Sequence, residues 1–364
     1  MKICFFLGGF YQNGGIGRVT SILANRFANE ANVEVIALGY FDPHKDRIYN
    51  LSPKIQMDYF LSSYESMAKL LLEGREKKLR KYLVDNNVDV LIACGALFFP
   101  LSTRACRKIK TKCICWEHSN PEGNDDHRWQ GLARRYGIKR SDVNVVLTKR
   151  ALQIYKEKYG ICNTVQIYNP IDPELLKRPK EYNFTSKKII SVGRLTYQKN
   201  FAAAVDVAKQ ILPKHPEWEW HIFGQGEELK MLVELTKKAG IAKQMKFKGQ
   251  VMDLYDRYHD YSIMVMTSRY EGFPMTLLEG MGNGLPLVSF DIPTGPNEII
   301  VEGENGFLID PFDTTMMAEK IQNLIDSKKL REQLAQDNLS KVSMFKEEEI
   351  VKAWMNLLKK LVQE

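Results

Sequence analysis

The sequence predicts an α/β protein made of two Rossmann-like domains, each built on a doubly wound parallel sheet. Apolar, β-type segments alternate with segments of helical periodicity along the chain, a pattern typical of parallel sheets covered by helices. The pattern stops at a polar, proline-containing stretch over residues 169–183 and then restarts, as expected of a linker. With 364 residues, the chain is also longer than one hydrophobic core usually supports. We therefore place the first domain at residues 1–178 and the second at residues 179–345.

Each domain begins with a strand and continues with alternating helices and strands. In the first domain, strands are expected over residues 1–7, 33–38, 88–93, 112–116 and 144–147, and a glycine-rich loop and a helix over residues 19–28 follow the first of them. In the second domain, strands are expected over residues 188–192, 220–223, 245–247, 263–266 and 286–289. Residues 346–364 contain a last amphipathic helix, which we expect to pack back on the first domain.

The composition excludes several classes of protein. With 44% hydrophobic and 26% charged residues, the chain is typical of a globular protein and not of a disordered or fibrous one. Its longest apolar stretch, residues 90–101, is interrupted by Gly95 and Pro100 and is too short to cross a bilayer. Six irregularly spaced cysteines fit a reducing compartment and lack the paired spacing of a zinc site. Because the first residues also lack the pattern of a cleaved signal, we expect a cytoplasmic protein.

Positive charge is concentrated in the first half of the chain. Residues 1–180 contain 29 Lys and Arg against 18 Asp and Glu, whereas residues 181–364 contain 23 against 26. This asymmetry predicts an anionic partner for the first half, which is nucleic acid, a membrane surface or a phosphorylated substrate. No nucleic-acid-binding motif with interleaved aromatic residues is present, so we expect no nucleic acid partner.

A glycine-rich loop joins the first predicted strand to the first predicted helix. Gly15 and Gly17 allow backbone N–H groups to approach a phosphate, and the helix dipole favours an anion at this point. The segment is not a complete G-x-G-x-x-G, because Thr20 occupies the third glycine position. A tight turn that packs the helix on the strand is the alternative interpretation.

A second motif follows the first strand of the second domain. Gly193 and Arg194 come directly after the apolar residues of this strand, and Lys199 follows in the same loop. Ligands of doubly wound sheets bind at the carboxyl ends of the strands. A guanidinium can grip a diphosphate with two parallel hydrogen bonds, whereas an ammonium acts as a point charge. The two cations therefore suit a diphosphate, and solvated surface charge is the alternative.

The third candidate is a pair of glutamates around the start of a helix. Pro274 suits the first turn of a helix that follows a glycine turn. Glu271 then precedes the helix and Glu279 lies inside it, so that two carboxylates flank N–H groups able to hold an anion or sugar hydroxyls. In the alternative, Glu271 only caps the helix and Glu279 faces outward.

Together these motifs resemble those of the family 4 retaining glycosyltransferases of the GT-B fold, in which two Rossmann-like domains face each other across a cleft. The signature of that family is two glutamates separated by seven residues, as Glu271 and Glu279 are. The resemblance spans nearly the whole chain, because the glycine loop, Gly193-Arg194, Lys199 and residues 224–227 and 303–308 agree in order and spacing. The loop 294–298 is similar to a variant found in hexosyl and N-acetylhexosaminyl transferases of surface polysaccharide or lipid-linked glycan assembly.

The resemblance implies a role for each matching residue. Gly15 and Gly17 would face the donor diphosphate, Arg194 and Lys199 would neutralise it, and Glu279 would bind the nucleotide ribose. Glu271 would face the donor sugar, and the remaining donor-binding positions, largely through their backbone, would be Gly193, Gly272, Phe273, Pro274, Met275 and Thr276. His118 matches the active-site histidine of the family, and a purely structural hydrogen bond is the alternative for this residue. The expected catalytic residues are therefore His118, Arg194, Lys199 and Glu271.

The resemblance also implies a mechanism without a cofactor or a metal. In a retaining transfer with no obvious nucleophile, an oxygen of the departing diphosphate can accept the proton of the incoming hydroxyl on the same face of the sugar. Cations and N–H groups of the protein then stabilise the developing charge. The sequence has no D-x-D motif for a metal in this role, since the pair Asp125-Asp126 lacks that spacing. We expect a UDP-linked hexose or N-acetylhexosamine as the donor.

A basic amphipathic helix is expected from Lys69 to Leu83. Its apolar positions are Leu72, Leu79 and Leu83, and its cations are Arg75, Lys77, Lys78, Arg80 and Lys81. Helices of this kind bind anionic membrane surfaces, as an acceptor carried on a polyprenyl diphosphate would require at the inner face of the plasma membrane. An ordinary surface helix packed by its leucines is the alternative.

Three other functions remain open from the residues alone. Glycoside hydrolases use paired carboxylates about 5 to 9.5 Å apart, but Arg194 and Lys199 favour a phosphorylated donor. A nicotinamide oxidoreductase would need an acidic residue at the end of the second strand, where Asp42 is the candidate. A non-enzymatic carbohydrate-binding protein is the third.

Overall fold

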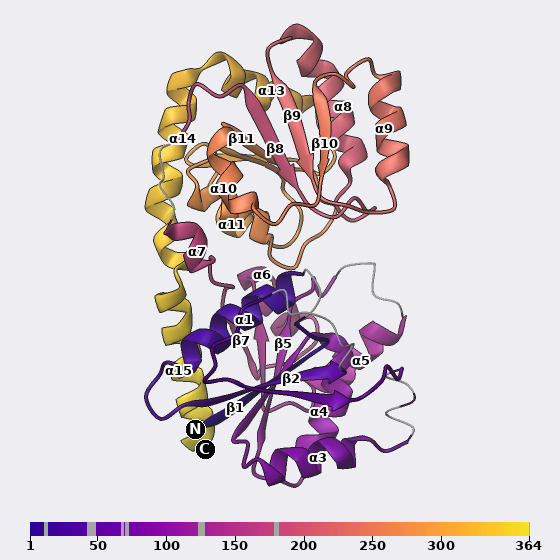
Figure 1. The fold of residues 1–364 in the computed structure, drawn as a ribbon, viewed down its shortest axis with the longest axis vertical. Helices are drawn as coiled ribbons and strands as arrows, with labels where there is room; N and C mark the ends of the chain where they lie inside the picture. The colour runs from indigo at the N-terminus through magenta and orange to yellow at the C-terminus, as the bar shows by residue number, and fades with distance from the viewer. Residues whose placement is uncertain are drawn as a thin grey trace. The chain divides into compact units, whose positions relative to one another are not determined.

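The computed structural model describes residues 1–10, 14–41, 49–66, 69, 73–122, 128–177 and 182–363. The chain forms two compact units (Figure 1). Unit 1 comprises Met1–Pro170 and Glu347–Glu364, and unit 2 comprises Ile171–Lys346. Unit 2 thus begins at Ile171, whereas the linker composition led us to place the boundary after residue 178. Two acidic positions discussed above, Asp42 and the pair Asp125-Asp126, lie outside the described residues.

Unit 1 is built on a seven-stranded parallel sheet in the order β3-β2-β1-β4-β5-β6-β7. The strands are β1 (Lys2–Leu7), β2 (Glu34–Phe41), β3 (Gln56–Leu61), β4 (Val90–Cys94), β5 (Lys112–Glu117), β6 (Val143–Val146) and β7 (Thr164–Gln166). The helices are α1 (Gly15–Phe27), α3 (Glu76–Asp85), α4 (Phe99–Cys106), α5 (Arg128–Ile138), α6 (Lys149–Glu157) and α15 (Glu347–Gln363), with a short 3₁₀ turn at Ala96–Phe98.

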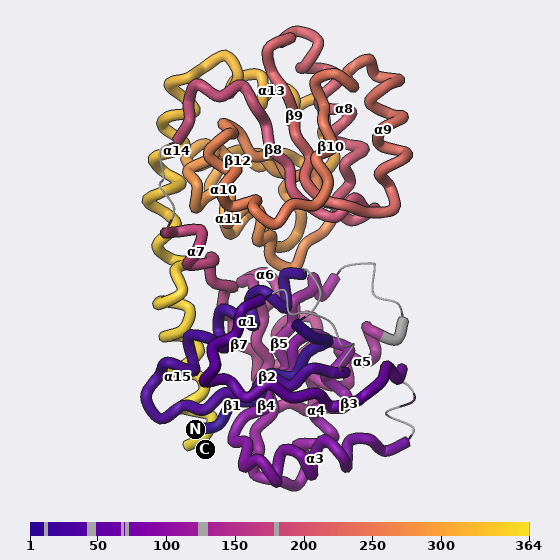
Figure 2. Tube along the Cα trace, in the orientation of Figure 1, coloured from indigo at the N-terminus to yellow at the C-terminus, as the bar shows by residue number. Residues whose placement is uncertain are grey.

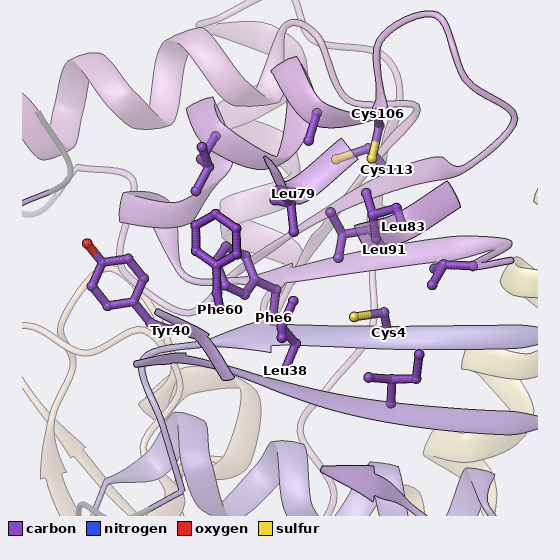
Figure 3. Packing of buried hydrophobic residues seen from close by; sticks show 14 of the residues in the cluster. Cys4, Phe6, Leu38, Tyr40, Phe60, Leu79, Leu83, Leu91, Cys106 and Cys113 are labelled. Carbon is purple, nitrogen blue, oxygen red and sulfur yellow. The ribbon is translucent and has the colours of Figure 1, made fainter. Parts of the chain in front are cut away.

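Adjacent residues of β1 pack on opposite faces of this sheet, because successive side chains of a strand alternate. Phe6 joins a buried cluster with Leu79 of α3 and Leu101 of α4 (Figure 3). Phe5 stacks on Phe27 of α1, with ring centroids 5.8 Å apart. Helices therefore cover both faces, which confirms the doubly wound sheet that the alternation of segments predicted.

The C-terminal helix α15 belongs to unit 1 and lies next to α1 (Figure 2). Its Trp354 is fully buried, and the ring lies 5.1 Å from Trp116 of β5 and 6.5 Å from Phe27 of α1. The apolar face of α15 thus fills the same side of the sheet as α1, which explains why the helix is amphipathic along its length.

Unit 2 is built on a six-stranded parallel sheet in the order β10-β9-β8-β11-β12-β13. The strands are β8 (Lys188–Val192), β9 (Glu219–Phe223), β10 (Met245–Gly249), β11 (Ile263–Met266), β12 (Leu287–Phe290) and β13 (Gly306–Ile309). The helices are α7 (Pro173–Leu176), α8 (Phe201–Ile211), α9 (Leu229–Lys238), α10 (Leu254–Arg257), α11 (Met275–Gly282), α12 (Pro296–Ile299), α13 (Thr314–Asp326) and α14 (Lys328–Lys341), with 3₁₀ turns at Leu212–Lys214, Tyr258–Asp260 and Val342–Phe345.

The helix expected from Lys69 to Leu83 is interrupted by a turn, although Lys69 itself is helical. Gly74 has a positive φ of 68°, and α3 begins only at Glu76. Left-handed backbone geometry ends a helix, so residues 73–75 form a turn instead of helix. Leu72 lies outside the described residues.

Three of the five cations named for the amphipathic face bind other parts of unit 1. Arg75 forms ion pairs with Glu65 and Glu73, Lys78 donates to the carbonyl oxygen of Phe60, and Arg80 donates to the carbonyl oxygens of Arg104 and Ala105. Lys77 and Lys81 are exposed, which leaves a much smaller charged face than the sequence predicts.

Within the described part of the chain, no helix combines the length and the apolar character needed to cross a bilayer.

Candidate active site

The strand order of unit 2 places a ligand site between β8 and β11. These two strands pair with each other, and the chain connects outward from them in opposite directions along the sheet. Ligands of doubly wound sheets bind at such a reversal, outside the carboxyl ends of the strands. The loop after β8 carries Gly193, Arg194 and Lys199, and the loop after β11 carries Glu271. The fold therefore brings two predicted motifs to one point, although they are 72 residues apart in sequence.

An ion pair joins the two loops. Lys199 Nζ lies 2.6 Å from Glu271 Oε1, and the side chains are 14% and 8% exposed. Ser268 Oγ donates to the same carboxylate oxygen at 2.7 Å, and the Thr294 hydroxyl donates to the backbone oxygen of Glu271. Glu271 Oε2, in contrast, has no hydrogen-bond partner among the residues that the structure describes. The carboxylate is held by one oxygen and can accept a ligand donor with the other.

The backbone under this ion pair is packed too closely for side chains. A Cβ atom at Gly193 would lie 3.0 Å from the aliphatic carbons of Lys199. A Cβ atom at Gly224, where φ is +140°, would lie 1.8 Å from the carbonyl oxygen of Gly193. At Gly226 it would lie 2.2 Å from the carbonyl oxygen of Leu195. Gly224 and Gly226 thus allow the loop after β9 to pack on the loop after β8. Gly193 allows the aliphatic part of Lys199 to pack on the backbone.

Arg194 lies in the same loop as Lys199 but does not take part in the ion pair with Glu271. Its guanidinium is exposed and donates to Gln198 Oε1 at 3.2 Å. Gln198 in turn donates to the carbonyl oxygen of Tyr270 at 3.1 Å. The structure therefore brings Lys199 to Glu271 and leaves Arg194 at the solvent edge of the site.

The helix that follows Glu271 begins without a side-chain cap. Its N-cap residue is Pro274, and the helix α11 has no acidic residue in its first turn. Gly295, with φ +104°, packs against Pro274, and a Cβ atom there would lie 2.4 Å from the proline ring. The alternative in which Glu271 caps this helix is therefore wrong, because the carboxylate binds Lys199 and Ser268 instead. A helix start without a side-chain cap suits an anion, because the positive end of the helix dipole lies there.

The predicted donor-binding stretch has different roles along its length. Phe273 is 5% exposed, and its ring lies 5.9 Å from Phe345, so the side chain belongs to the core and only its backbone is suited to a ligand. Gly272, Met275 and Thr276 are partly exposed. The burial of the Phe273 side chain beside these partly exposed residues agrees with ligand recognition through backbone groups.

Glu279 does not face outward, contrary to the alternative interpretation. It is 3% exposed, and Tyr258 donates its hydroxyl hydrogen to Glu279 Oε2 at 2.5 Å. Tyr258 is itself fully buried in the 3₁₀ turn Tyr258–Asp260. The hydrogen bond from Tyr258 offsets part of the cost of burying this carboxylate, and the inward position is compatible with a binding role for Glu279.

In unit 1, the glycine loop forms the start of α1 beside the equivalent reversal between β1 and β4. Gly14 is the N-cap residue, no side chain caps the helix, and Gly14 N donates to the Tyr49 hydroxyl at 2.9 Å. A Cβ atom at Gly17 would lie 3.0 Å from the Tyr49 ring, whereas one at Gly15 would meet nothing within 4 Å. Gly17 thus allows close packing of the Tyr49 ring on the helix, and Gly15 stands at the exposed start of the helix.

His118 follows β5 directly and is held mainly by aromatic packing. Its ring lies 4.2 Å from the Trp116 ring, and its Nε2 atom is buried with no hydrogen-bond partner in the described part of the chain. Burial lowers the pKa of His118 to about 3. The imidazole is therefore neutral at physiological pH, and its unpartnered nitrogen is suited to a hydrogen bond with a ligand.

Three residues of these sites were missed by the sequence analysis. Ser268 could have been found as the polar residue after a buried strand, at the ligand-binding end of a parallel sheet. Tyr258 and Tyr49 carry no comparable signal, because their contacts join segments that are distant in sequence.

Among the described residues, no three His, Cys, Asp or Glu side chains come together in a way that could hold a metal ion. Metal independence stays a prediction, since it concerns the reaction and not the protein alone.

Two family models match the chain, one over each half. The model described as Glycosyltransferase Family 4 matches residues 13–175, and the model described as Glycosyl transferases group 1 matches residues 173–340.

Relatives match the chain over nearly its whole length. An uncharacterized glycosyltransferase of Haemophilus influenzae is 28% identical, with 98% of this chain and 99% of the relative covered. The amylovoran biosynthesis glycosyltransferase AmsD of Erwinia amylovora is 27% identical with the same coverage. Among solved structures, Anabaena HepE in complex with UDP has a TM-score of 0.81 at 17% identity, with 99% of this chain and 100% of the other covered.

These matches favour transfer of a sugar over the hydrolase, oxidoreductase and non-enzymatic alternatives. The chain belongs to the family 4 glycosyltransferases and has their GT-B fold of two Rossmann-like domains.

Proposed function

We propose that this protein is a retaining glycosyltransferase that moves a hexose or N-acetylhexosamine from a nucleotide sugar, with UDP as the nucleotide, to a glycan or lipid-linked glycan. The observation that carries this proposal is the Lys199–Glu271 pair at the reversal of the unit 2 sheet. It sets a cation for phosphate beside a carboxylate oxygen able to accept a sugar hydroxyl, next to an uncapped helix start. A sugar joined to a diphosphate carries both matching groups. The UDP complex of HepE supports the choice of nucleotide.

In this proposal the protein stabilises the leaving diphosphate with fixed charges and dipoles. Lys199 and the first N–H groups of α11 bind the phosphates, and Arg194 neutralises them from the solvent edge. As the bond from the sugar carbon to the phosphate oxygen breaks, that oxygen gains negative charge and accepts the proton of the incoming hydroxyl. The new bond forms on the same face, so the configuration is retained. Donors that are already oriented lower the barrier because they need no reorganisation during the reaction.

The remaining predicted residues bind and orient. Glu279, held by Tyr258, accepts hydrogen bonds from the ribose hydroxyls. Gly15 and Gly17 supply a helix start that suits phosphate, and His118 offers a neutral imidazole to a sugar hydroxyl. A neutral ring with a lowered pKa is a poor general base, so we assign His118 to hydrogen bonding instead of proton removal.

The acceptor side of the proposal places the enzyme in surface polysaccharide assembly. The name of AmsD, which refers to amylovoran biosynthesis, and the loop 294–298 support this choice. A polyprenyl-diphosphate-linked acceptor would bring the enzyme to the inner face of the plasma membrane, where the surplus positive charge of residues 1–180 would favour anionic lipid. The six unpaired cysteines, five of them buried, are consistent with work in the cytoplasm.

A panel of nucleotide sugars tests the proposal. Each is added to the protein at the same concentration, and the shift of the thermal unfolding midpoint is measured, because a ligand that binds only the folded state raises stability. We expect one or two UDP-linked sugars to give the largest shift and to support transfer to a glycan acceptor. Equal, negligible shifts with all donors would overturn the assignment.

A further inference from the structure

We infer that Glu271 makes the site selective for a sugar nucleotide over the free nucleotide, because its carboxylate competes with the diphosphate for Lys199. This inference rests on the proposed function and adds a second role to a residue expected to face the donor sugar. In this role the carboxylate is an internal competitor of the leaving group.

The geometry of the ion pair carries the first step. Lys199 Nζ and Glu271 Oε1 are 2.6 Å apart, with both side chains largely buried. The lysine stem packs closely on Gly193, where a Cβ atom would lie 3.0 Å from it, and Ser268 holds the same carboxylate oxygen. Neither partner can move aside without losing contacts, so an anion that reaches Lys199 also approaches Glu271.

Electrostatics gives the second step. Screening by water and salt is weaker for largely buried charges than for exposed ones. The carboxylate therefore neutralises much of the charge of Lys199 and repels an incoming diphosphate. This repulsion weakens the binding of a free nucleoside diphosphate, because its terminal phosphate carries no sugar hydroxyl that could donate a hydrogen bond to Glu271.

A sugar attached to the diphosphate offsets the repulsion between Glu271 and the phosphates. Glu271 Oε2 lacks a partner among the described residues, so a sugar hydroxyl can donate to it, and hydrogen bonds to an ionised acceptor are strong. After transfer this hydrogen bond is lost, whereas the repulsion remains. The same residue would then favour binding of the donor and release of the nucleotide product.

Glu271 could have the opposite role, that of orienting Lys199 toward the diphosphate. The two roles predict opposite effects of removing the carboxylate. Competition predicts that Glu271→Gln binds UDP more tightly, and orientation predicts that it binds UDP more weakly.

The experiment measures UDP affinity by calorimetry for the wild type, Glu271→Gln, Lys199→Met and the double variant. We expect Glu271→Gln to bind UDP roughly tenfold more tightly, as one close charge pair at an intermediate dielectric allows. In the Lys199→Met background the same change should give a clearly smaller gain, because only the direct repulsion between the carboxylate and the diphosphate is then removed. The control is Glu234→Gln, which removes the carboxylate of an exposed ion pair with Lys237 on α9 and should leave UDP affinity unchanged.

Several results would overturn the inference. Weaker or unchanged UDP binding by folded Glu271→Gln would do so, and so would an equal gain in both backgrounds, which would indicate simple repulsion without competition. If Glu271→Gln does not fold, as judged by its thermal unfolding, Glu271→Ala answers the same question with the carboxylate removed completely.

The same titrations with inorganic pyrophosphate separate this inference from the proposed function. If no variant binds UDP but pyrophosphate shows the expected pattern, the choice of nucleotide is wrong and the competition stands. If pyrophosphate binds the wild type and Glu271→Gln equally, the competition is wrong whatever the nucleotide.

Discussion

Two largely buried ion pairs, one in each unit, show how similar chemistry serves different purposes. In unit 1, Arg134 Nε lies 2.6 Å from Glu117 Oε2, with the side chains 6% and 1% exposed. In unit 2, Lys199 and Glu271 lie at the same distance. Both glutamates lie at or just after the carboxyl end of a parallel strand, which is the ligand-binding edge of such a sheet.

The two carboxylates differ in how many of their oxygens already accept hydrogen bonds. Glu117 Oε1 accepts from the backbone N–H of Ser119 at 2.9 Å, and Oε2 accepts from Arg134 and from the Tyr155 hydroxyl at 3.4 Å. Both oxygens are occupied, so this pair is closed and ties β5 to α5 and α6. Glu271 keeps one oxygen open among the described residues. The carboxylate of a buried ion pair indicates a ligand site only when one of its oxygens is unsatisfied.

The largest expected effect comes from breaking the closed pair. Glu117→Gln leaves the Arg134 guanidinium buried without its counter-charge, and removing one partner of a buried pair typically costs about 3–5 kcal/mol. We expect the free energy of unfolding to fall by this amount in a urea titration. Glu271→Gln serves as the matched variant and should lose much less stability, because its site is already open to a ligand. Equal losses in the two variants would contradict the distinction between closed and open pairs.

The next effect concerns His118, the neighbour of Glu117. In an unfolded chain the imidazole gains a proton near pH 6.5, whereas in the folded protein its pKa is about 3. Between these values the unfolded state binds more protons, so stability falls as the pH falls, by at most about 1.4 kcal/mol per pH unit.

The check is unfolding in urea at several pH values. Relative to His118→Asn, the wild type should lose about 1.6 kcal/mol between pH 6.5 and pH 5. The same pH dependence in both proteins would show that the histidine is not held neutral by burial.

A smaller effect tests the second carboxylate of unit 2. Glu279→Gln keeps the size of the side chain but removes the charge that strengthens hydrogen bonds to ribose hydroxyls. We expect UDP affinity to fall by roughly tenfold, as the loss of one charge-assisted hydrogen bond implies. Calorimetry measures this change, with Glu234→Gln as the exposed control. An unchanged affinity would return Glu279 to a structural role beside Tyr258.

The smallest effect concerns the uneven charge of the two halves of the chain. Lys77 and Lys81 on α3 are exposed, whereas Arg75, Lys78 and Arg80 bind within unit 1. A lysine near an anionic membrane contributes about 1 kcal/mol, and Lys81 is already paired with Asp85, so changing both to Gln should weaken binding to phosphatidylglycerol vesicles by roughly fivefold.

Sedimentation with vesicles measures this binding at low and at high salt, since the attraction is screened. Changing Lys237 and Lys238 of α9 to Gln is the control with equal loss of charge in unit 2. If the α3 variant binds as the wild type does, α3 is not the membrane contact.

The sequence predicts the interior of each sheet better than its edges. All ten expected strands are present, and nine of them lie inside their sheets, where parallel strands are continuous apolar segments; β10 is the exception, at an edge. The strands β3, β7 and β13 were missed, and each lies at the edge of its sheet. The short β7, Thr164–Gln166, and the half-polar β3 bury too few side chains for a clear pattern.

In the candidate site, too, the sequence predicts some features and not others. The motif around Glu271 and Glu279 could be read from spacing, but the contact of Glu271 with Lys199 depends on which strands pair. Neither the burial of Glu279 against Tyr258 nor the turn at Gly74 could be predicted, because both depend on three-dimensional packing or backbone geometry.

We propose that protein cations, and not a metal ion, stabilise the leaving diphosphate. The most direct measurement is the turnover of the wild type and of Lys199→Met in excess EDTA, with the nucleotide sugar identified by the panel. We expect EDTA to leave the wild type unchanged, and Lys199→Met to lose roughly 10²- to 10³-fold in kcat, as removal of one preorganised group does. Loss of wild-type turnover in EDTA that Mg²⁺ or Mn²⁺ restores would contradict the account.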